Sequence, residues 1–357
     1  MTAKTDFRTS IEKFQECRLL VLGDVMLDEY IWGRVGRICP EAPVPIVEEE
    51  RRSGIPGGMA NVAMNAAALG AHVTVGGVVG EDAQGKALRD MLRVLGIDTT
   101  GLRTDPHRPT TTKTRIIAHN QQVVRVDRED TRPISPALQQ ELLDWFRGCL
   151  PAADLCILSD YAKGVLSAAL TCEAIAAARQ HGRPVVVDPK GWDYRRYRGA
   201  TVITPNLREA RLALTNGAPP PDDLFALGAG LLKLLPGTSV IVTRGSEGVT
   251  LFREAHDPVH IPSAAHQVYD VTGAGDTLVA TLAVSMSAGS PLELAAALAN
   301  CAAGVAVGKV GTSTVSKGEL LKVTPFINCK RMPTDLEFSN AGTALAGSHF
   351  HVKGLRR

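Results

Sequence analysis

The chain of 357 residues is 45% hydrophobic and 21% charged, which supplies enough apolar material for one large domain. Its formal net charge of +2 gives no general attraction for nucleic acid or for an anionic membrane, so neither is expected as a partner. Residues 1–16 lack the apolar core of a signal peptide, and no apolar run approaches a membrane span in length. The seven cysteines are scattered singly, which favours reduced thiols in a cytoplasmic enzyme over a disulfide framework or a zinc site.

Short apolar runs alternate with helical patterns along most of the chain. The predicted strands are Arg18–Gly23, His72–Val79, Leu155–Ser159, Pro184–Asp188, Ala200–Thr204 and Ser239–Arg244. The predicted helices are Ala60–Leu69, Gly85–Leu95, Ala168–Gln180, Leu224–Leu234, Thr277–Ala288 and Pro291–Val307. This order predicts an α/β fold, with a mostly parallel central sheet that is covered by helices on both faces. Ligands bind to such sheets beyond the carboxyl ends of the strands.

Two segments, Tyr30–Val47 and Thr111–Asp127, alternate polar with apolar residues and do not fit this order. They are typical of half-exposed antiparallel strands, and we expect a small β lid within about residues 28–50 and 110–128. Because a sheet of this size buries little apolar surface by itself, we expect it to close over the substrate or to pair with a second subunit. An edge hairpin without function is the alternative. Residues 321–357 have weak periodicity, and we expect a C-terminal extension that is partly disordered.

The segment Asp270–Thr277 (DVTGAGDT) stands directly before a predicted helix. Gly273 and Gly275 allow the backbone to approach a ligand closely, and the helix start offers free amides to an anion such as a phosphoryl group in transfer. Asp276 would lie beside that anion, where it could accept a proton from an incoming hydroxyl. Aspartate is also a common helix cap, so the motif alone leaves a purely structural role open. A Walker P-loop and a GxGxxG fingerprint at the first strand–helix junction are both absent, which disfavours a dinucleotide-dependent oxidoreductase.

DVTGAGDT resembles the second signature of the ribokinase-like (PfkB-type) carbohydrate kinases. Four further segments follow the order of that family: Gly57–Asn61, Val79–Gly85, Asn206–Glu209 and Thr243–Gly248. The resemblance covers residues 16–320 and implies a ribokinase-like three-layer sandwich that phosphorylates a sugar with ATP and Mg²⁺. We expect a homodimer that forms through the lid strands.

The resemblance implies a role for individual residues. Asp276 would be the catalytic base, and the amides of Gly273, Ala274 and Gly275 would form the anion hole. Residues for the nucleotide and its Mg²⁺ would be Asn206, Glu209 (through water), Thr243, Gly245, Gly248 and Asn300. An ordinary helix start at Asn206–Glu209 and a satisfied buried amide at Asn300 are the alternatives. Asp270 matches a position that helps to hold a monovalent cation in some members, so activation by K⁺ is a further expectation.

Several stretches resemble one branch of the family, the bacterial D-glycero-β-D-manno-heptose 7-phosphate kinases. They are Gly23–Tyr30, Pro56–Asn65, Asn120–Gln122, Ser159–Gly164 and Val187–Gly191. That branch makes heptose 1,7-bisphosphate on the route to ADP-heptose for the lipopolysaccharide core. The sequence ends without the nucleotidyltransferase domain that some members carry, so we expect a monofunctional kinase. A kinase for another sugar or a nucleoside and a non-catalytic sugar-phosphate sensor are the alternatives, and the intact Asp276 disfavours the sensor.

A sugar phosphate needs polar groups for its ring and positive charge for its phosphate. The ring is expected to contact Asp28, Gly57, Gly58, Asn61 and Asn65. The existing phosphate would bind away from the transfer site, where Lys163, Lys190 and Arg125 are available. Lys163 and Lys190 are preferred because they follow strands in turns that face one cleft. Arg125 lies on the lid, where pairing with Asp127 or with a neighbouring subunit is the alternative.

Overall fold

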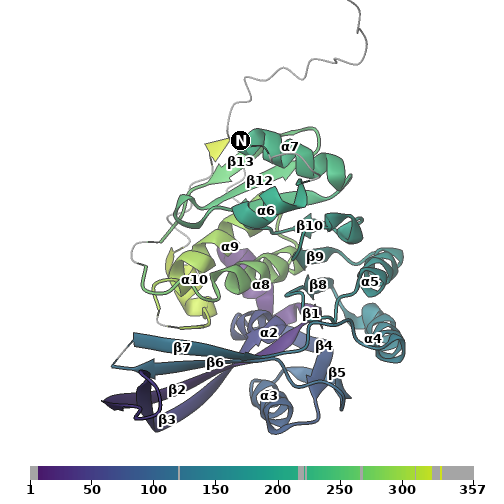
Figure 1. Ribbon diagram of the computed structural model, residues 1–357. Helices are drawn as coiled ribbons and strands as arrows, with labels where there is room; N and C mark the ends of the chain where they lie inside the picture. The colour runs from purple at the N-terminus through teal and green to yellow at the C-terminus, as the bar shows by residue number, and fades with distance from the viewer. Residues whose placement is uncertain are drawn as a thin grey trace, which may run out of the picture.

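The computed structural model describes residues 7–119, 121–215, 221, 223–265, 268–309, 311–323 and 330–331. These residues form a sandwich of helices around one large sheet, and a second, smaller sheet projects from one side of it (Figure 1). None of the helices in these ranges has the length and continuous hydrophobicity that crossing a lipid bilayer requires.

The large sheet has ten strands in the order β14-β13-β12-β11-β10-β9-β8-β1-β4-β5. Its strands are β1 (Arg18–Gly23), β4 (His72–Gly80), β5 (Asp98–Asp105), β8 (Leu155–Ser159), β9 (Val185–Asp188), β10 (Val202–Ile203), β11 (Ser239–Thr243), β12 (Val249–Arg253), β13 (His256–Ile261) and β14 (Lys330–Arg331). The strands from β5 to β11 pair in parallel, whereas β12, β13 and β14 continue the sheet in antiparallel pairing. The predicted mostly parallel sheet is confirmed.

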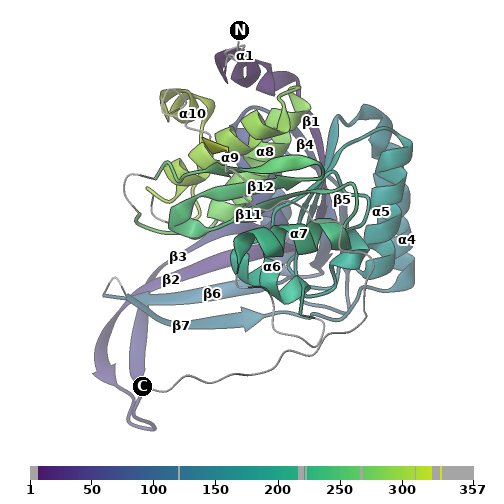
Figure 2. The ribbon, with the colours of Figure 1, turned by 90° about the horizontal axis from the view of Figure 1, so that it is seen from above.

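Strand β1 shows how the sheet builds two cores. Leu19 and Val21 point into one hydrophobic cluster, while Leu20 and Leu22 point into the other. The first cluster lies under α1 (Phe7–Glu12), α2 (Met59–Ala68), α3 (Ala83–Val94), α8 (Ala274–Ser287), α9 (Leu292–Ala306) and α10 (Lys317–Val323). The second cluster lies under α4 (Pro136–Cys149), α5 (Ala168–Gln180), α6 (Leu207–Ala213) and α7 (Leu224–Leu234). In Figure 2, α1, α8, α9 and α10 lie on one face of the sheet and α4, α5, α6 and α7 on the other, as the alternation in the sequence predicts.

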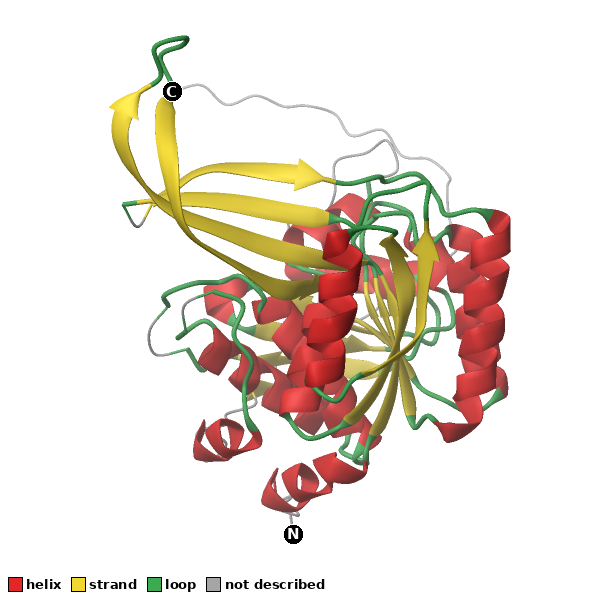
Figure 3. Cartoon of the chain, turned by 90° about the horizontal axis from the view of Figure 1, so that it is seen from below, coloured by secondary structure: helices red, strands yellow, loops and turns green. Residues whose placement is uncertain are grey.

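The smaller sheet consists of two hairpins, and we call it the lid sheet. Its strands are β2 (Val25–Ile38), β3 (Pro45–Gly58), β6 (Thr112–Ala118) and β7 (Gln121–Arg128), in the order β3-β2-β6-β7. Each hairpin is antiparallel, but β2 and β6 pair in parallel, so the sheet is mixed rather than antiparallel throughout. The first hairpin extends beyond the expected range at both ends and reaches Gly57 and Gly58. Figure 3 shows these strands projecting from the body of the molecule.

Most predicted elements agree with the structure to within one to three residues, and β1, β8, α5 and α7 have the predicted bounds. The predicted strand Ala200–Thr204 is reduced to the two residues of β10. Most of the expected C-terminal extension lies outside the described residues. The part that is described contributes the last three residues of α10 and the short edge strand β14, which pairs with β13.

Candidate active site

A cavity of about 280 Å³ opens at the carboxyl ends of the parallel strands, where the lid sheet meets the large sheet. Three groups of residues line it: Met26, Asp28, Gly58, Lys113 and Arg115 from the lid side; Asp188, Lys190, Thr204, Asn206, Glu209 and Thr243 from the strand ends; and Thr272, Gly273, Gly275 and Asp276 from the start of α8. Asp276 therefore lies at the junction of the lid and the strand ends, as a residue that joins two substrates must.

The start of α8 requires glycine. Gly273 is the residue before the helix and adopts a left-handed conformation with φ of 79°. A Cβ atom at this position would lie 2.8 Å from Nδ2 of Asn61. The Gly275 amide has no hydrogen-bond partner among the described residues, whereas the Ala274 amide contacts the Val271 carbonyl at 3.3 Å. The helix start thus keeps a free donor for an anion beside Asp276.

Two hydrogen bonds hold the Asp276 carboxylate. Asn61 Nδ2 donates to Oδ2 at 2.5 Å, and the Tyr161 hydroxyl donates to Oδ1 in a short contact. Burial raises the pKa of Asp276 to about 6, although both hydrogen bonds act to lower it. The carboxylate is therefore ionised at neutral pH yet more basic than an ordinary aspartate, which suits a general base.

Asn61 and Asn65 lie behind Asp276. Asn65 Nδ2 donates to the main-chain and side-chain oxygens of Asn61 at 2.9 and 3.1 Å, and Asn65 Oδ1 accepts a hydrogen bond from Thr277 Oγ1 at 3.0 Å. Both asparagines are buried and neither lines the cavity. In this conformation they orient the carboxylate instead of facing the space in which a sugar would bind.

The loop after β8 brings Tyr161 to the site. The buried carboxylate of Asp24 accepts hydrogen bonds from the amides of Tyr161, Lys163 and Val165 at 2.8, 3.0 and 3.0 Å. The loop belongs to the segment Ser159–Gly164 that resembles the heptose 7-phosphate kinases, but no role was predicted for Tyr161. The contact between Tyr161 and Asp276 joins residues that are 115 positions apart, so no local pattern announces it.

The NxxE segment forms a capping box at the start of α6. Asn206 Oδ1 accepts from the Glu209 amide at 2.9 Å, and the Glu209 carboxylate accepts from the Asn206 amide at 3.0 Å. The ordinary helix start is thus present, and both side chains also line the cavity. Lys190 Nζ bonds the other Glu209 oxygen at 2.5 Å, so this lysine lies at the same end of the cavity as the NxxE segment.

Asp188 ends β9 and also lines the cavity, although it was not among the predicted site residues. Burial and then the neighbouring carboxylates of Asp276 and Glu209 raise its pKa well above the usual value. No group of three or more His, Cys, Asp or Glu residues in the described ranges could hold a metal by itself. Two carboxylates beside a phosphate site nevertheless fit Mg²⁺, which keeps several waters and shares its remaining ligands with the nucleotide.

A second cavity of about 250 Å³ adjoins the first and shares Thr243, Gly275 and Leu278 with it. It is lined mainly by small and apolar residues, as a purine site would be: Gly245, Ser246, Gly248, Val249, Val268, Val271, Ala303, Gly304 and Val307. Asn300 also borders this cavity, while its Nδ2 donates to the Pro262 carbonyl at 2.8 Å. The two cavities thus form one continuous path past Asp276.

On the lid side, Asp28 is held by Arg115. Arg115 Nη1 lies 2.6 Å from Asp28 Oδ1, and its guanidinium also stacks over the Tyr30 ring at 5.3 Å. A Cβ atom at Gly57 would lie 2.4 Å from Asp28 Oδ2, so the carboxylate packs directly against this glycine. Asp28 and Gly58 both line the cavity.

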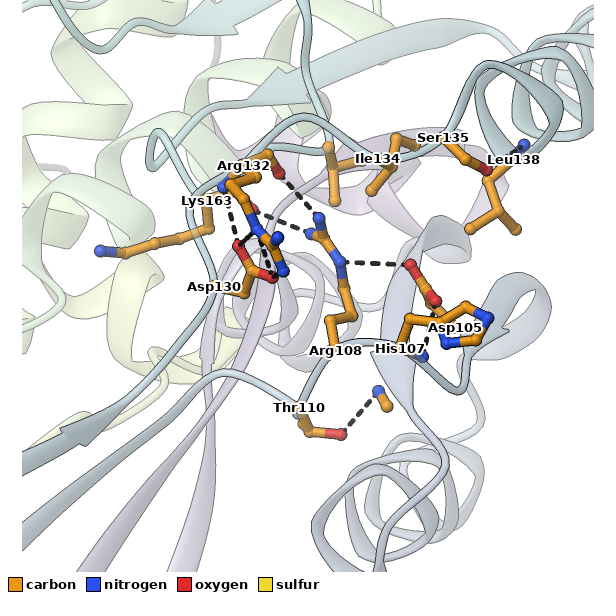
Figure 4. A network of polar contacts seen from close by, with 12 residues as sticks. Asp105, His107, Arg108, Thr110, Asp130, Arg132, Ile134, Ser135, Leu138 and Lys163 are labelled. Atoms are coloured by element: carbon orange, nitrogen blue, oxygen red, sulfur yellow. Dashed lines mark hydrogen bonds and ion pairs between the residues drawn. The ribbon is translucent and has the colours of Figure 1, made fainter.

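Lys163 and Arg125 do not line either cavity. Lys163 Nζ pairs with Glu129 at 2.7 Å, and Arg125 forms the bidentate pair with Asp127 that the sequence left open, at 2.8 and 2.9 Å. Figure 4 shows the network that anchors Lys163: Arg108 donates to the main-chain oxygens of Lys163 and Arg132 at 3.3 and 2.7 Å. This network ties the loop after β8 to both ends of the β6–β7 hairpin.

Asp270 lies in the loop before α8. Its two carboxylate oxygens accept from the amides of Thr272 and Gly311 at 2.9 and 3.1 Å. Burial acts to raise its pKa, but these hydrogen bonds outweigh it and lower the pKa below the usual value. An ionised carboxylate is therefore present where the sequence predicts a monovalent cation.

Residues 18–318 match the model of the pfkB family carbohydrate kinases. A protein named "Bifunctional protein HldE" from Geobacter sulfurreducens is 47% identical over 302 residues, which cover 85% of this chain and 62% of the relative. A protein of the same name from Aeromonas hydrophila is 45% identical and is covered to 65%. The chain thus spans a little under two thirds of the length of these relatives.

Two solved structures share the fold at low sequence identity. Arabidopsis thaliana ribokinase complexed with ribose and ATP superposes with a TM-score of 0.68 at 22% identity, covering 86% of this chain and 98% of the other. The tetrameric inhibited form of Escherichia coli phosphofructokinase-2 gives a TM-score of 0.71 at 18% identity, with coverages of 87% and 99%. The family match and the ribokinase-like architecture agree, and the chain belongs to the pfkB family of carbohydrate kinases.

Proposed function

We propose that this protein transfers the γ-phosphoryl group of ATP to the anomeric hydroxyl of D-glycero-β-D-manno-heptose 7-phosphate, giving the 1,7-bisphosphate for ADP-heptose synthesis. The observation that carries the phosphoryl transfer is the Asp276 carboxylate, which stands beside the Gly275 amide of α8, a donor without a partner among the described residues, where the two cavities meet. The choice of sugar rests on the resemblance of the sequence to heptose 7-phosphate kinases and on relatives named HldE at about 45% identity.

In this mechanism the nucleotide base occupies the apolar cavity near Asn300, and the phosphates reach past Thr243 toward α8. Asp276 accepts the proton of the sugar hydroxyl while the Gly275 amide and the helix dipole stabilise the charge on the phosphoryl group. Asn61 and Tyr161 keep the carboxylate aimed at the hydroxyl. The protein contributes position and charge, and phosphoryl transfer requires little else.

Glu209 and Asp188 are the residues that we propose for Mg²⁺, mostly through water. Mg²⁺ would neutralise the transferring phosphate and would also offset the repulsion between these carboxylates. Asp270 is our candidate for a monovalent cation, and comparing rates in K⁺, Na⁺ and Cs⁺ salts tests it.

The lid sheet is our candidate for the contact with a second copy of the chain. All of β7 is exposed at the sheet edge, and it carries the exposed valines Val123, Val124 and Val126. An exposed apolar edge strand invites pairing with another chain. Light scattering after size-exclusion chromatography tests the expected homodimer. We place the enzyme in the cytoplasm, because ATP is available there and the six cysteines in the described ranges are all free thiols.

The proposed reaction is tested with Mg-ATP and a panel of pentose, hexose and heptose phosphates together with the free sugars. We expect heptose 7-phosphate to be consumed with the highest kcat/KM and the product to show two phosphorus NMR signals, one from an anomeric phosphate. Equal or faster turnover of a free sugar would refute the proposed substrate. A failure to consume ATP with every sugar would support the non-catalytic sensor instead.

A further inference from the structure

Lys113 is a cation of the lid sheet without an ion-pair partner in the part of the chain that the structure describes. Its side chain projects from β6, is partly buried and lines the cavity that holds Asp276. No hydrogen bond or ion pair of its ammonium group occurs among the described residues. The two other cations that line the cavity are both paired, Arg115 with Asp28 and Lys190 with Glu209.

The register of the lid sheet explains why Lys113 is unpaired. Lys113 lies opposite Asp28 on β2 and opposite Asp127 on β7, so two carboxylates flank it on the same face of the sheet. Arg115 pairs with Asp28 at 2.6 Å, and Arg125 forms a bidentate pair with Asp127. Lys113, Arg115 and Arg125 therefore share only the two carboxylates of Asp28 and Asp127, and Lys113 is the cation that is left over.

The surroundings of Lys113 favour an anionic ligand. Burial lowers the pKa of Lys113, and the nearby charge of Lys163 lowers it further. Lys163 pairs with Glu129, so the Glu129 carboxylate is not available to neutralise Lys113. A phosphate group beside Lys113 would replace lost hydration and remove the electrostatic cost of holding an unpaired ammonium group there.

We propose that Lys113 binds the phosphate that the sugar already carries, and that it thereby selects sugar phosphates over free sugars. This inference rests on the proposed function. Asp28 lies between the two ends of the substrate site. Its negative charge raises the pKa of Asp276, and it lies beside Lys113 on the neighbouring strand of the lid sheet. A sugar whose anomeric hydroxyl meets Asp276 can contact Asp28 with its ring and reach Lys113 with its far end. Of the two lysines that the sequence analysis prefers, Lys190 also lines the cavity but pairs with Glu209, whereas Lys163 does not line it.

The kinetic test compares Lys113→Met with the wild type on heptose 7-phosphate and on unphosphorylated heptose. Losing one charged contact should lower kcat/KM for the sugar phosphate about tenfold to a hundredfold, with little change for free heptose or in the KM for ATP. Lys113→Arg keeps the charge and should retain most of the selectivity. Lys86→Met on α3 is the matched control, because Lys86 is exposed and pairs only with Asp90. Unchanged selectivity in a folded Lys113→Met variant would overturn the proposal.

A second measurement does not depend on turnover or on a variant that folds. Wild-type protein is acetylated with acetic anhydride, and modification of Lys113 is followed by mass spectrometry of peptides. Heptose 7-phosphate should protect Lys113 severalfold, whereas free heptose should not; equal modification with and without the sugar phosphate contradicts the assignment. If the wild type phosphorylates no sugar phosphate, the proposed function fails. The anion site at Lys113 is then tested separately with inorganic phosphate. If inorganic phosphate does not protect Lys113 from acetylation, the anion site is refuted.

Discussion

Replacing Asp276 with asparagine tests the catalytic carboxylate through both stability and activity. Burial raises the pKa of this group to about 6 from the usual 3.8, so the folded protein disfavours its charged form. At 1.36 kcal/mol per pH unit, the difference between these values means that the ionised carboxylate costs about 3 kcal/mol of folding free energy. A residue kept only as a helix cap would gain nothing from such a cost.

The sign of the effect follows from protonation. Well below pH 3.8 the carboxyl group is protonated in both the folded and the unfolded state, so the cost is absent. The cost grows as the pH rises from about 4 to 6 and is constant above that range. Asparagine stays neutral at every pH. The free energy of unfolding of Asp276→Asn, relative to wild type, should therefore increase by about 3 kcal/mol between pH 3 and pH 7, as urea denaturation at several pH values can measure.

Activity should change in the opposite direction. Loss of a general base typically lowers kcat by a factor of about 10² to 10⁴, while calorimetry should show that the variant still binds ATP and sugar phosphate. In the wild type, kcat should fall as the pH drops through about 6, because the base becomes protonated. Near-normal kcat in the variant, or a stability difference that does not depend on pH, would refute the assignment of Asp276.

Three further substitutions probe the surroundings of Asp276. Tyr161→Phe removes a hydrogen bond that lowers the pKa of Asp276, so the acid limb of the kcat profile should move to higher pH; an unmoved limb would exclude this role. Glu209→Gln should raise the Mg²⁺ concentration for half-maximal rate about tenfold, and an unchanged Mg²⁺ titration would remove Glu209 from the metal site. Gly57→Ala places a Cβ 2.4 Å from Asp28 Oδ2, so the KM for the sugar should rise about tenfold while that for ATP stays constant. Equal changes in both KM values would instead indicate general distortion.

The order of strands and helices was predictable because it depends on local patterns. Buried parallel strands are continuous apolar runs, as in β1 and β8, and the helix starts and stops carry their own signals. The pairing of the lid sheet was less predictable. Alternation along β2 and β6 shows that they are half-exposed strands, but it cannot show that they pair in parallel, because this depends on where the two hairpins leave the large sheet.

The residues of the candidate site also fall into two groups, those that a local motif predicts and those that only the folded chain brings together. Asp276 and its glycines stand together in eight residues, so one motif predicts the anion site and the base. The partners of Asp276 come from α2 and from the loop after β8, and only the folded chain brings them together. Lys113 and Arg115 did leave a signal, since basic residues at alternate positions of a strand share one face. Which of these two cations is free depends on Asp28, and that pairing is a tertiary contact.

Charge is arranged differently at the two ends of the main cavity, and this difference supports the order of the substrates within it. Asp188 and Glu209 give the nucleotide end an excess of carboxylates, which is unfavourable for ATP unless Mg²⁺ accompanies it. The lid end has an excess of positive charge. Arg115 and Arg125 pair there with the carboxylates of Asp28 and Asp127, and Lys113 adds a cation without a partner among the described residues. A phosphate without a metal is therefore better placed at the lid, and Mg-ATP at the strand ends. Asp276 lies between the two ends, where only the transferred phosphoryl group must pass.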